Sequence, residues 1–292
     1  MNTLQAAVLG LLQGLTEFLP VSSSGHLILG SALLGLPAPG LSFSIMVHLG
    51  TALATVVMLR REIAWLLRGI FAERYGSRAL SATWFLVVAS VPGALVGVAG
   101  GRLIEDAFSS IWVASVGLIV TGLVLWQSRL AARPGGRGVR AVSDRSGSRR
   151  RPGSQASGEP AGDILGTVTL RRALSVGVAQ AFAVVPGISR SGATIATGLL
   201  AGLSREDAAR FSFLLSLPAV FGAALLDFRK AALSDAPVFS GVALTGAAIA
   251  FVSGVVALSA VFRAVKKGEL SSFAYYCWVV GGVSLVWFLV LR

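Results

Sequence analysis

The sequence predicts an all-α integral membrane protein with six transmembrane helices and two re-entrant helix-loop-helix hairpins in inverted-topology repeats. Three observations lead to this prediction: an apolar composition, apolar segments of two different lengths, and two similar motifs far apart in the chain. The 292-residue chain is 54% hydrophobic and 13% charged, with a mean hydropathy of +0.78. Because soluble domains carry about 25% charged residues, this chain has too few polar residues to cover a surface in water.

Six apolar segments are long enough to cross the hydrocarbon core of a bilayer, which takes about 20 helical residues. They are 43–59, 80–101, 111–127, 210–227, 238–262 and 271–291. The shorter apolar segments form two pairs, each interrupted by a turn rich in proline, serine and glycine. Because proline and glycine end helices, each pair is predicted to enter the membrane and turn back, as hairpins over 3–36 and 173–203.

The two hairpins share one spacing of polar residues. Gln13, Ser22, Ser24 and Gly25 recur with an offset of 167 residues as Gln180, Ser189, Ser191 and Gly192. The chain is therefore predicted to contain repeat 1 over 1–128, a flexible linker over 129–170, and repeat 2 over 171–292. Each repeat holds one hairpin and three spans, and three is odd, so the second repeat is inverted and the two tips approach from opposite sides.

The net charge of +12 comes largely from arginines in two segments between apolar runs, 60–78 and 129–172. Basic loops next to spans are typical of the cytoplasmic side, which argues against a nucleic-acid partner and places both segments in the cytoplasm. Residues 102–110 are then predicted to form a short outer loop. The linker has no apolar periodicity and is expected to be disordered.

The two turns carry most of the candidate site residues. A broken helix at membrane depth is tolerated only inside protein or along a wet cavity, so these turns indicate a buried polar site. The candidates are Gln13, Glu17, Ser22, Ser23, Ser24 and His26 from the first hairpin, and Gln180, Ser189, Arg190, Ser191 and Thr194 from the second. Serines that cap helix N-termini, together with an arginine, predict an anion-binding pocket.

Several roles stay open at this level. Glu17 and Arg190 either bind a ligand or form a structural ion pair that holds the hairpins together. The candidate nucleophiles are Ser23 with Glu17 or His26 as base, His26 itself, and a water activated by Glu17; Ser23 with His26 in proton transfer is favoured. His48, in the middle of a span, is interpreted as structural or supporting.

The segments 13–26 (QGLTEFLPVSSSGH) and 186–194 (PGISRSGAT) closely resemble the two motifs of the bacterial undecaprenyl-diphosphatases, also called bacitracin-resistance proteins. The resemblance extends over nearly the whole chain outside 129–165. It implies hydrolysis of undecaprenyl diphosphate, which recycles the lipid carrier for peptidoglycan synthesis, and it implies catalytic or binding roles for the candidates. By motif position the essential groups are Glu17, Ser23, His26, Ser189, Arg190 and Thr194.

The resemblance also implies a divalent cation, Mg²⁺ or Ca²⁺, with Glu17 as its candidate ligand. Gln13 stands where the family has Glu or Gln, and the amide removes one anionic ligand. The implied location is the bacterial inner membrane, with a site that opens to the periplasmic or extracellular side. The alternative function is a lipid-phosphate flippase or secondary transporter, since inverted repeats are typical of transporters. The oligomeric state stays open, with a homodimer as one candidate.

Overall fold

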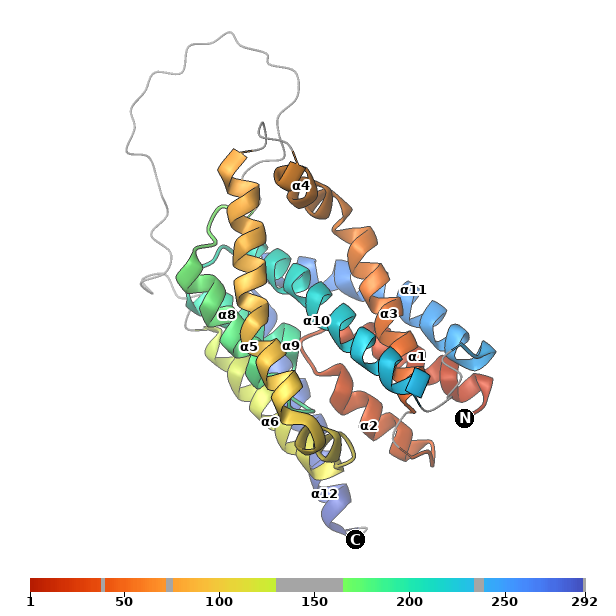
Figure 1. Cartoon of the computed structure of the whole chain (residues 1–292). Coiled ribbons are helices and arrows are strands. Elements are labelled where there is room, and N and C mark those ends of the chain that lie inside the picture. The colour runs from red at the N-terminus through yellow and green to blue at the C-terminus, as the bar shows by residue number, and fades with distance from the viewer. Residues whose placement is uncertain (38–39, 72–75, 130–164, 234–238, 291–292) are drawn as a thin grey trace, which may run out of the picture.

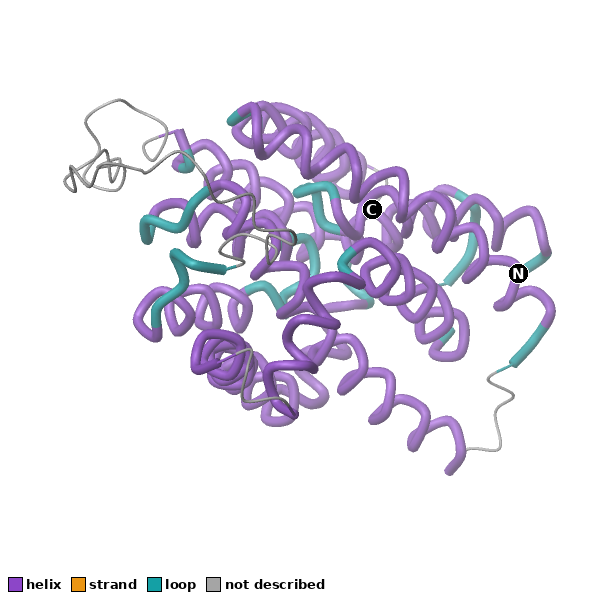
Figure 2. Tube along the Cα trace, turned by 90° about the horizontal axis from the view of Figure 1, so that it is seen from above, coloured by secondary structure: helices purple, strands orange, loops and turns teal. Residues whose placement is uncertain are grey.

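The computed structural model describes residues 1–37, 40–71, 76–129, 165–233 and 239–290 (Figure 1). Figure 2 shows helices and loops only in this part of the chain. The elements are α1 (Thr3–Phe18), α2 (Ser23–Leu33), α3 (Leu41–Met58), α4 (Arg60–Phe71), α5 (Gly76–Phe108), α6 (Ile111–Gln127), α8 (Leu170–Phe182), α9 (Arg190–Leu200), α10 (Arg205–Leu233), α11 (Gly241–Lys267), the 3₁₀ turn η2 (Leu270–Ser272) and α12 (Phe273–Val290).

The prediction of an all-helical, multi-pass membrane protein is confirmed. Among the described residues, four helices are long and apolar enough to cross a membrane: α5, α10, α11 and, with η2, α12. A fifth span results if α3 and α4, which are bent by 77° at a short break, are counted together. α6 is apolar throughout but one residue shorter than the 18 residues required of a span.

Both short apolar pairs break at the predicted turns. α1 ends at Phe18, and α2 begins after Ser22, whose φ of 70° lies in the left-handed region and whose Oγ accepts a hydrogen bond from the Gly25 amide. α8 ends at Phe182, and α9 begins after Ser189, whose Oγ accepts from the Gly192 amide at 3.1 Å. The cap and the glycine thus occupy corresponding positions in the two breaks.

The helix contacts are reciprocal between the two predicted repeats. α1 lies on α11, where a side chain at Gly10 would overlap the backbone of Gly246, and α8 lies on α5, where a side chain at Gly177 would overlap the backbone of Ala89. Gly10 and Gly177 are separated by the same 167 residues as the motifs. α6 packs against α12, and α3 against α10, and these are pairs of corresponding helices. The repeat boundaries themselves stay a prediction.

The structure corrects the prediction at two loops. Residues 60–71 of the predicted basic loop form helix α4, because the segment is amphipathic: Leu66 is buried, while Arg60, Arg61 and Arg68 are exposed. The prediction of an outer loop over 102–110 is also wrong for residues 102–108. α5 continues to Phe108 across a kink at Gly101, where φ is 37°, so only two residues connect it to α6.

The described ends of the predicted linker are held against the helices, and residues 130–164 lie outside the described residues. The Arg129 guanidinium lies 3.7 Å from the centre of the Trp126 ring. At the other end, Leu165 and Val168 are buried, and the Leu165 amide donates to the Asp207 carboxylate at 3.1 Å.

The tip of the second hairpin depends on a glycine. Gly187 has a φ of 88°, and a side chain there would overlap the carbonyl of Ala114 in α6. We therefore expect Gly187→Ala to lower the free energy of unfolding by about 1–3 kcal/mol from backbone strain alone, and by more if the overlap with Ala114 is not relieved. Denaturant titration in mixed micelles measures this change. Gly222→Ala is the control, because it lies in helix α10 with open space around it and alanine favours helix. Equal stability of Gly187→Ala and wild type would contradict this packing of the tip.

Candidate active site

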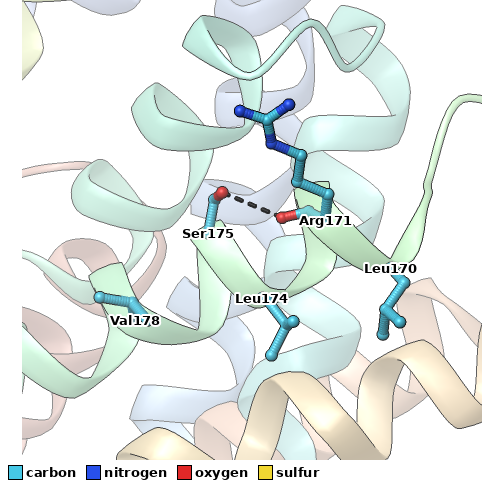
Figure 3. A pocket seen from close by; sticks show the side chains of 5 residues that line it. All are labelled: Leu170, Arg171, Leu174, Ser175 and Val178. Carbon is cyan, nitrogen blue, oxygen red and sulfur yellow. Dashed lines mark hydrogen bonds between the residues drawn. The ribbon is translucent and has the colours of Figure 1, made fainter.

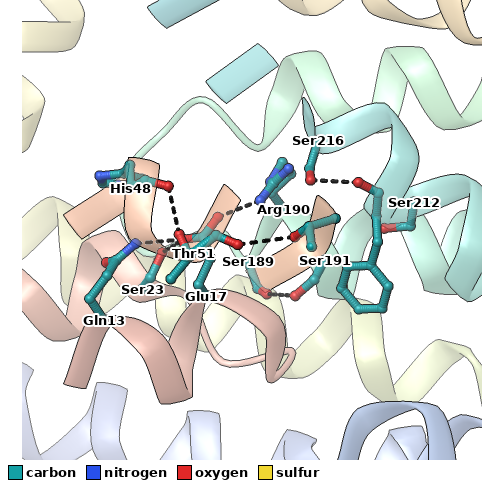
Figure 4. A network of polar contacts seen from close by, with 12 residues as sticks. Gln13, Glu17, Ser23, His48, Thr51, Ser189, Arg190, Ser191, Ser212 and Ser216 are labelled. Atoms are coloured by element: carbon teal, nitrogen blue, oxygen red, sulfur yellow. Dashed lines mark hydrogen bonds and ion pairs between the residues drawn. The ribbon is translucent and has the colours of Figure 1, made fainter. Parts of the chain in front are cut away.

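Glu17 is the centre of a buried polar cluster between the two hairpins (Figure 4). Its carboxylate forms an ion pair with Arg190, and the two side chains are 7% and 19% exposed. The same carboxylate accepts hydrogen bonds from Ser23 Oγ at 2.5 Å and from Gln13 Nε2 at 3.0 Å. Four of the predicted site residues, separated by up to 177 positions along the chain, therefore meet at one carboxylate.

Local structure brings these groups together. Glu17 lies in the last turn of α1, Ser23 is the first residue of α2, and Arg190 is the first residue of α9. Ser22 and Ser189 cap the two following helices, so the N-terminal ends of α2 and α9 meet beside the carboxylate. The N-terminal end of a helix carries a partial positive charge and free N–H groups. These two helix ends therefore stabilise the Glu17 carboxylate, which the C-terminal end of α1 by itself would destabilise.

Two polar atoms in the cluster are buried and have no hydrogen-bond partner among the described residues. They are Arg190 Nη1 and Gln13 Oε1. A buried polar atom without a partner costs about 1–3 kcal/mol, so such atoms are uncommon unless a ligand completes them. Arg190 thus uses Nη2 for Glu17 and keeps a second donor for an anion.

The serines two residues after the caps, Ser24 and Ser191, join the two tips to each other. Within each turn two hydroxyls lie 3.2 Å apart, Ser22 with Ser24 and Ser189 with Ser191. Across the tips, Ser24 Oγ accepts from the Gly187 amide at 3.4 Å, and Ser191 Oγ donates to the Leu19 carbonyl at 3.2 Å. These predicted binding residues therefore border the Glu17–Arg190 pair and hold the broken backbones together.

Thr194 bonds to the backbone of α9 and to α10, with no hydrogen bond to the carboxylate. It is fully buried, donates to the Arg190 carbonyl at 2.7 Å, and lies 2.5 Å from Ser212 Oγ on α10. It supports the first turn of α9, which carries Arg190. The sequence analysis did not single out Ser212, although the Phe-Ser pairs at 43–44 and 211–212 extend the repeat and could have indicated it.

Gln180 and His26 also lie apart from the bonds to Glu17: Gln180 is buried against Gly93 of α5, and its Oε1 has no partner among the described residues. The contacts of His26 lead to α12. Its Nδ1 lies 2.7 Å from the Ser22 carbonyl, and its Nε2 lies 2.8 Å from the hydroxyl of Tyr276 on α12. Neither ring nitrogen is bonded to Glu17 or Arg190. Sequence reasoning missed Tyr276, because nothing in the spacing of the chain relates α12 to the first hairpin.

His48 lies close enough to Glu17 to interact with it electrostatically, and Figure 4 draws it in the same network. Its Nδ1 is 2.8 Å from the Ser44 carbonyl within α3. This position agrees with the interpretation of His48 as a supporting residue.

A surface hollow lies on the outer side of α8 (Figure 3) and contains none of these residues. It is lined by Leu170, Arg171, Leu174, Ser175 and Val178. Its leucines and valine are 40–47% exposed, which suits a surface that faces lipid chains.

The fold and the site define a class: a multi-pass membrane protein in which two broken helices enclose a buried arginine–carboxylate pair with a spare anion donor. The family model described as Bacitracin resistance protein BacA matches residues 6–283, and the chain belongs to this family.

Curated relatives named undecaprenyl-diphosphatase match nearly the whole chain. The relative from Desulforapulum autotrophicum is 40% identical, over 98% of this chain and 98% of its own length. Those from Nocardioides sp. and Korarchaeum cryptofilum are 37% and 35% identical, over 97% and 96% of this chain and 95% and 97% of their own lengths.

The Glu17–Arg190 pair makes a prediction for stability. Arg190→Met leaves a buried carboxylate without its cation, and breaking such a pair costs about 3–5 kcal/mol. We expect Glu17→Gln combined with Arg190→Met to recover most of this loss, in denaturant titration of the purified protein. As control, Lys230→Met interrupts an ion pair whose side chains are both more than half exposed and is expected to change stability little. A double variant no more stable than Arg190→Met would contradict direct pairing.

Proposed function

We propose that this chain hydrolyses undecaprenyl diphosphate to undecaprenyl phosphate and phosphate. This reaction recycles the lipid carrier of cell-wall synthesis and accounts for resistance to bacitracin. The observation that carries the proposal is Arg190: its spare buried donor lies beside two helix N-termini in a chain of this family. Arginine binds phosphate oxygens with two donors at once, and a helix N-terminus favours an anion.

The proposed architecture has α3, α5, α6, α10, α11 and α12 as six spans, with α1–α2 and α8–α9 as re-entrant hairpins in inverted repeats. The reciprocal packing described above supports it. The arginines of 60–78 and of the predicted linker support a cytoplasmic location for both segments, by the positive-inside rule. The resemblance supports a location in the bacterial inner membrane and a site that opens to the periplasmic side.

The diphosphate binds between the hairpin tips, and Arg190 takes its oxygens as partners in place of Glu17. Positioned positive charge of this kind is the main contribution a protein makes to phosphoryl transfer. The polyprenyl tail stays in the apolar surroundings of the bundle. Exposed side chains such as Leu95, Val98 and Leu103 on α5, which are 65–81% exposed, form part of that lipid-facing surface.

Ser23 is the nucleophile that the geometry favours. Its Oγ donates to Glu17 at 2.5 Å, so the carboxylate, once Arg190 has moved to the phosphate, accepts the serine proton. Oγ forms a bond to the terminal phosphorus while the bridging P–O bond breaks, and undecaprenyl phosphate leaves. Water then releases the phosphate from Ser23. His26 has its Nε2 on Tyr276, so the structure supports Glu17 rather than His26 as the base for Ser23.

The implied divalent cation fits this site when the substrate brings it. Glu17 supplies one carboxylate and Gln13 supplies a buried amide oxygen without a partner. Within the described ranges no group of three or more His, Cys, Asp or Glu side chains is placed to hold a metal. Mg²⁺ in phosphoryl-transfer sites is held by one or two carboxylates plus the phosphates. Glu17 and Gln13 would hold it, and the cation would neutralise charge on the phosphate oxygens.

A flippase or transporter is the alternative. Two broken helices that meet inside a membrane protein suit either function. The serine hydroxyl in contact with a carboxylate favours hydrolysis, because transport requires no nucleophile.

Phosphate release from detergent-solubilised protein tests the function, since transport needs a sealed membrane and hydrolysis does not. We expect wild type to release phosphate from polyprenyl diphosphates, with a lower rate after chelation of divalent cations. Arg190→Lys is expected to lower kcat/KM at least about 100-fold, because lysine keeps the charge but loses the planar donor pair.

Arg171→Ala is the matched control, since this arginine is exposed on the outer side of α8 and should leave the rate unchanged. Near-normal hydrolysis by a folded Arg190→Lys variant would rule out the anion pocket. A wild-type protein that moves the lipid across vesicle bilayers but releases no phosphate would favour the alternative.

The nucleophile has a separate test. Ser23→Ala should lower kcat at least about 100-fold, and rapid quenching of wild type should trap an acid-stable phosphoserine. Ser31→Ala is the control, because this buried hydroxyl lies on the same helix and has no partner among the described residues. An active Ser23→Ala protein that accumulates acid-labile phosphate on His26 would replace serine by histidine in the mechanism.

A further inference from the structure

The side chain of Tyr276 contacts the Nε2 atom of His26. The Tyr276 hydroxyl lies 2.8 Å from His26 Nε2, and the two rings are nearly parallel, with 7° between their planes and 5.6 Å between their centres. His26 is on the first turn of α2 and Tyr276 on the first turn of α12, so the contact joins segments 250 residues apart.

The two contacts of the histidine ring determine which nitrogen carries its proton. Nδ1 lies 2.7 Å from the Ser22 carbonyl oxygen, and a carbonyl only accepts hydrogen bonds, so Nδ1 is the N–H donor. In the neutral ring Nε2 is then an acceptor, and the Tyr276 hydroxyl is the group that donates to it. Ser22 has little freedom to rearrange, since its backbone is already in the left-handed region with φ of 70°.

Exposure shows which of the two residues is the accessible one. His26 is 5% exposed, whereas Tyr276 is 45% exposed. The tyrosine therefore covers the histidine, and the only ring nitrogen with a lone pair faces the tyrosine hydroxyl. A proton that reaches or leaves Nε2 must pass this hydroxyl or displace it.

We propose that Tyr276 is a positioning residue for His26. The Ser22 carbonyl holds the proton on Nδ1, and the Tyr276 hydroxyl donates to Nε2, so that it fixes the orientation of the ring and keeps Nε2 as its basic atom. This inference rests on the proposed phosphatase function and adds to it a role for His26 in proton transfer when water releases the phosphate from Ser23. It explains why a histidine beside the serines is turned toward α12 instead of toward Glu17.

The neighbouring tyrosine provides a matched comparison. Tyr275 points to a different group of residues: its ring contacts Trp126 and Trp278, and its hydroxyl accepts from Arg129 at 3.3 Å. Loss of either hydroxyl removes one oxygen from the same turn of α12. Only loss of the Tyr276 hydroxyl changes the environment of His26.

The experiment compares Tyr276→Phe with Tyr275→Phe in the full-length protein. Phenylalanine keeps the stacked ring, so fold and substrate binding are retained. We expect Tyr276→Phe to lower kcat at least about tenfold with KM within about twofold, because an imidazole whose Nε2 is no longer held in position loses its function in proton transfer. Tyr275→Phe should match wild type in both constants.

A second readout does not depend on turnover. The chain has two histidines, so ¹⁵N-histidine NMR of the purified protein, with His48→Gln to assign the signals, reports the protonated nitrogen of His26. All three proteins should show protonated Nδ1, because the Ser22 carbonyl is unchanged, and only Tyr276→Phe should show a shifted Nε2 signal, because the Nε2 lone pair has lost the hydroxyl that donates to it.

The outcomes separate the inference from the function. If wild type releases phosphate and Tyr276→Phe matches Tyr275→Phe in kcat and in its NMR signals, the positioning role is overturned and the phosphatase function stands. If wild type releases no phosphate, the function fails and this role fails with it. A low kcat together with an unchanged Nε2 signal would also overturn the proposal, since the hydroxyl would then act by another route.

Discussion

The ion pair between Glu17 and Arg190 is the interaction on which the rest of the site depends. A charged side chain at membrane depth costs about 2.5–3.5 kcal/mol on insertion scales, and each of these two charges lies where an apolar helix has broken. Their pairing offsets that cost only if both breaks lie at the same place. The pair therefore requires the two hairpins to meet tip to tip, and every other polar contact of the site is arranged around that meeting.

Small residues make the meeting sterically feasible. A side chain at Gly25 would come within 3.2 Å of Gly187, and one at Gly192 would come within 3.3 Å of Pro20. The backbone groups freed by the breaks find partners in the capping serines and across the tips. This satisfies the requirement that polar backbone inside a membrane protein be hydrogen-bonded. Arg190 Nη1 and Gln13 Oε1 remain as buried side-chain atoms of the site without a hydrogen-bond partner among the described residues.

The two motifs share their spacing of serine and glycine, but they differ in their chemical groups. At the offset of the repeat, Glu17 corresponds to Val184, Ser23 to Arg190, and His26 to Ala193. The first hairpin thus supplies the carboxylate, the hydroxyl and the imidazole, and the second supplies the guanidinium. The serines that cap and join the tips are the groups retained in both halves. The serines present in both motifs stabilise the two breaks in the same way, while the residues present in only one motif form a single candidate anion site.

The sequence by itself determined the class of protein, the location of both helix breaks and most members of the polar cluster. These follow from composition, from proline and glycine, and from a spacing that repeats along the chain, all of which are local properties. It did not reveal that 60–71 and 102–108 are helical, because charge there outweighed amphipathic spacing. Only the tertiary structure decided which side chains touch: Ser23 lies on Glu17, Thr194 on Ser212, and His26 on Tyr276. The first contact depends on the path of the turn between α1 and α2, and the other two depend on how α10 and α12 pack against the hairpins. No pattern along one chain encodes that packing directly.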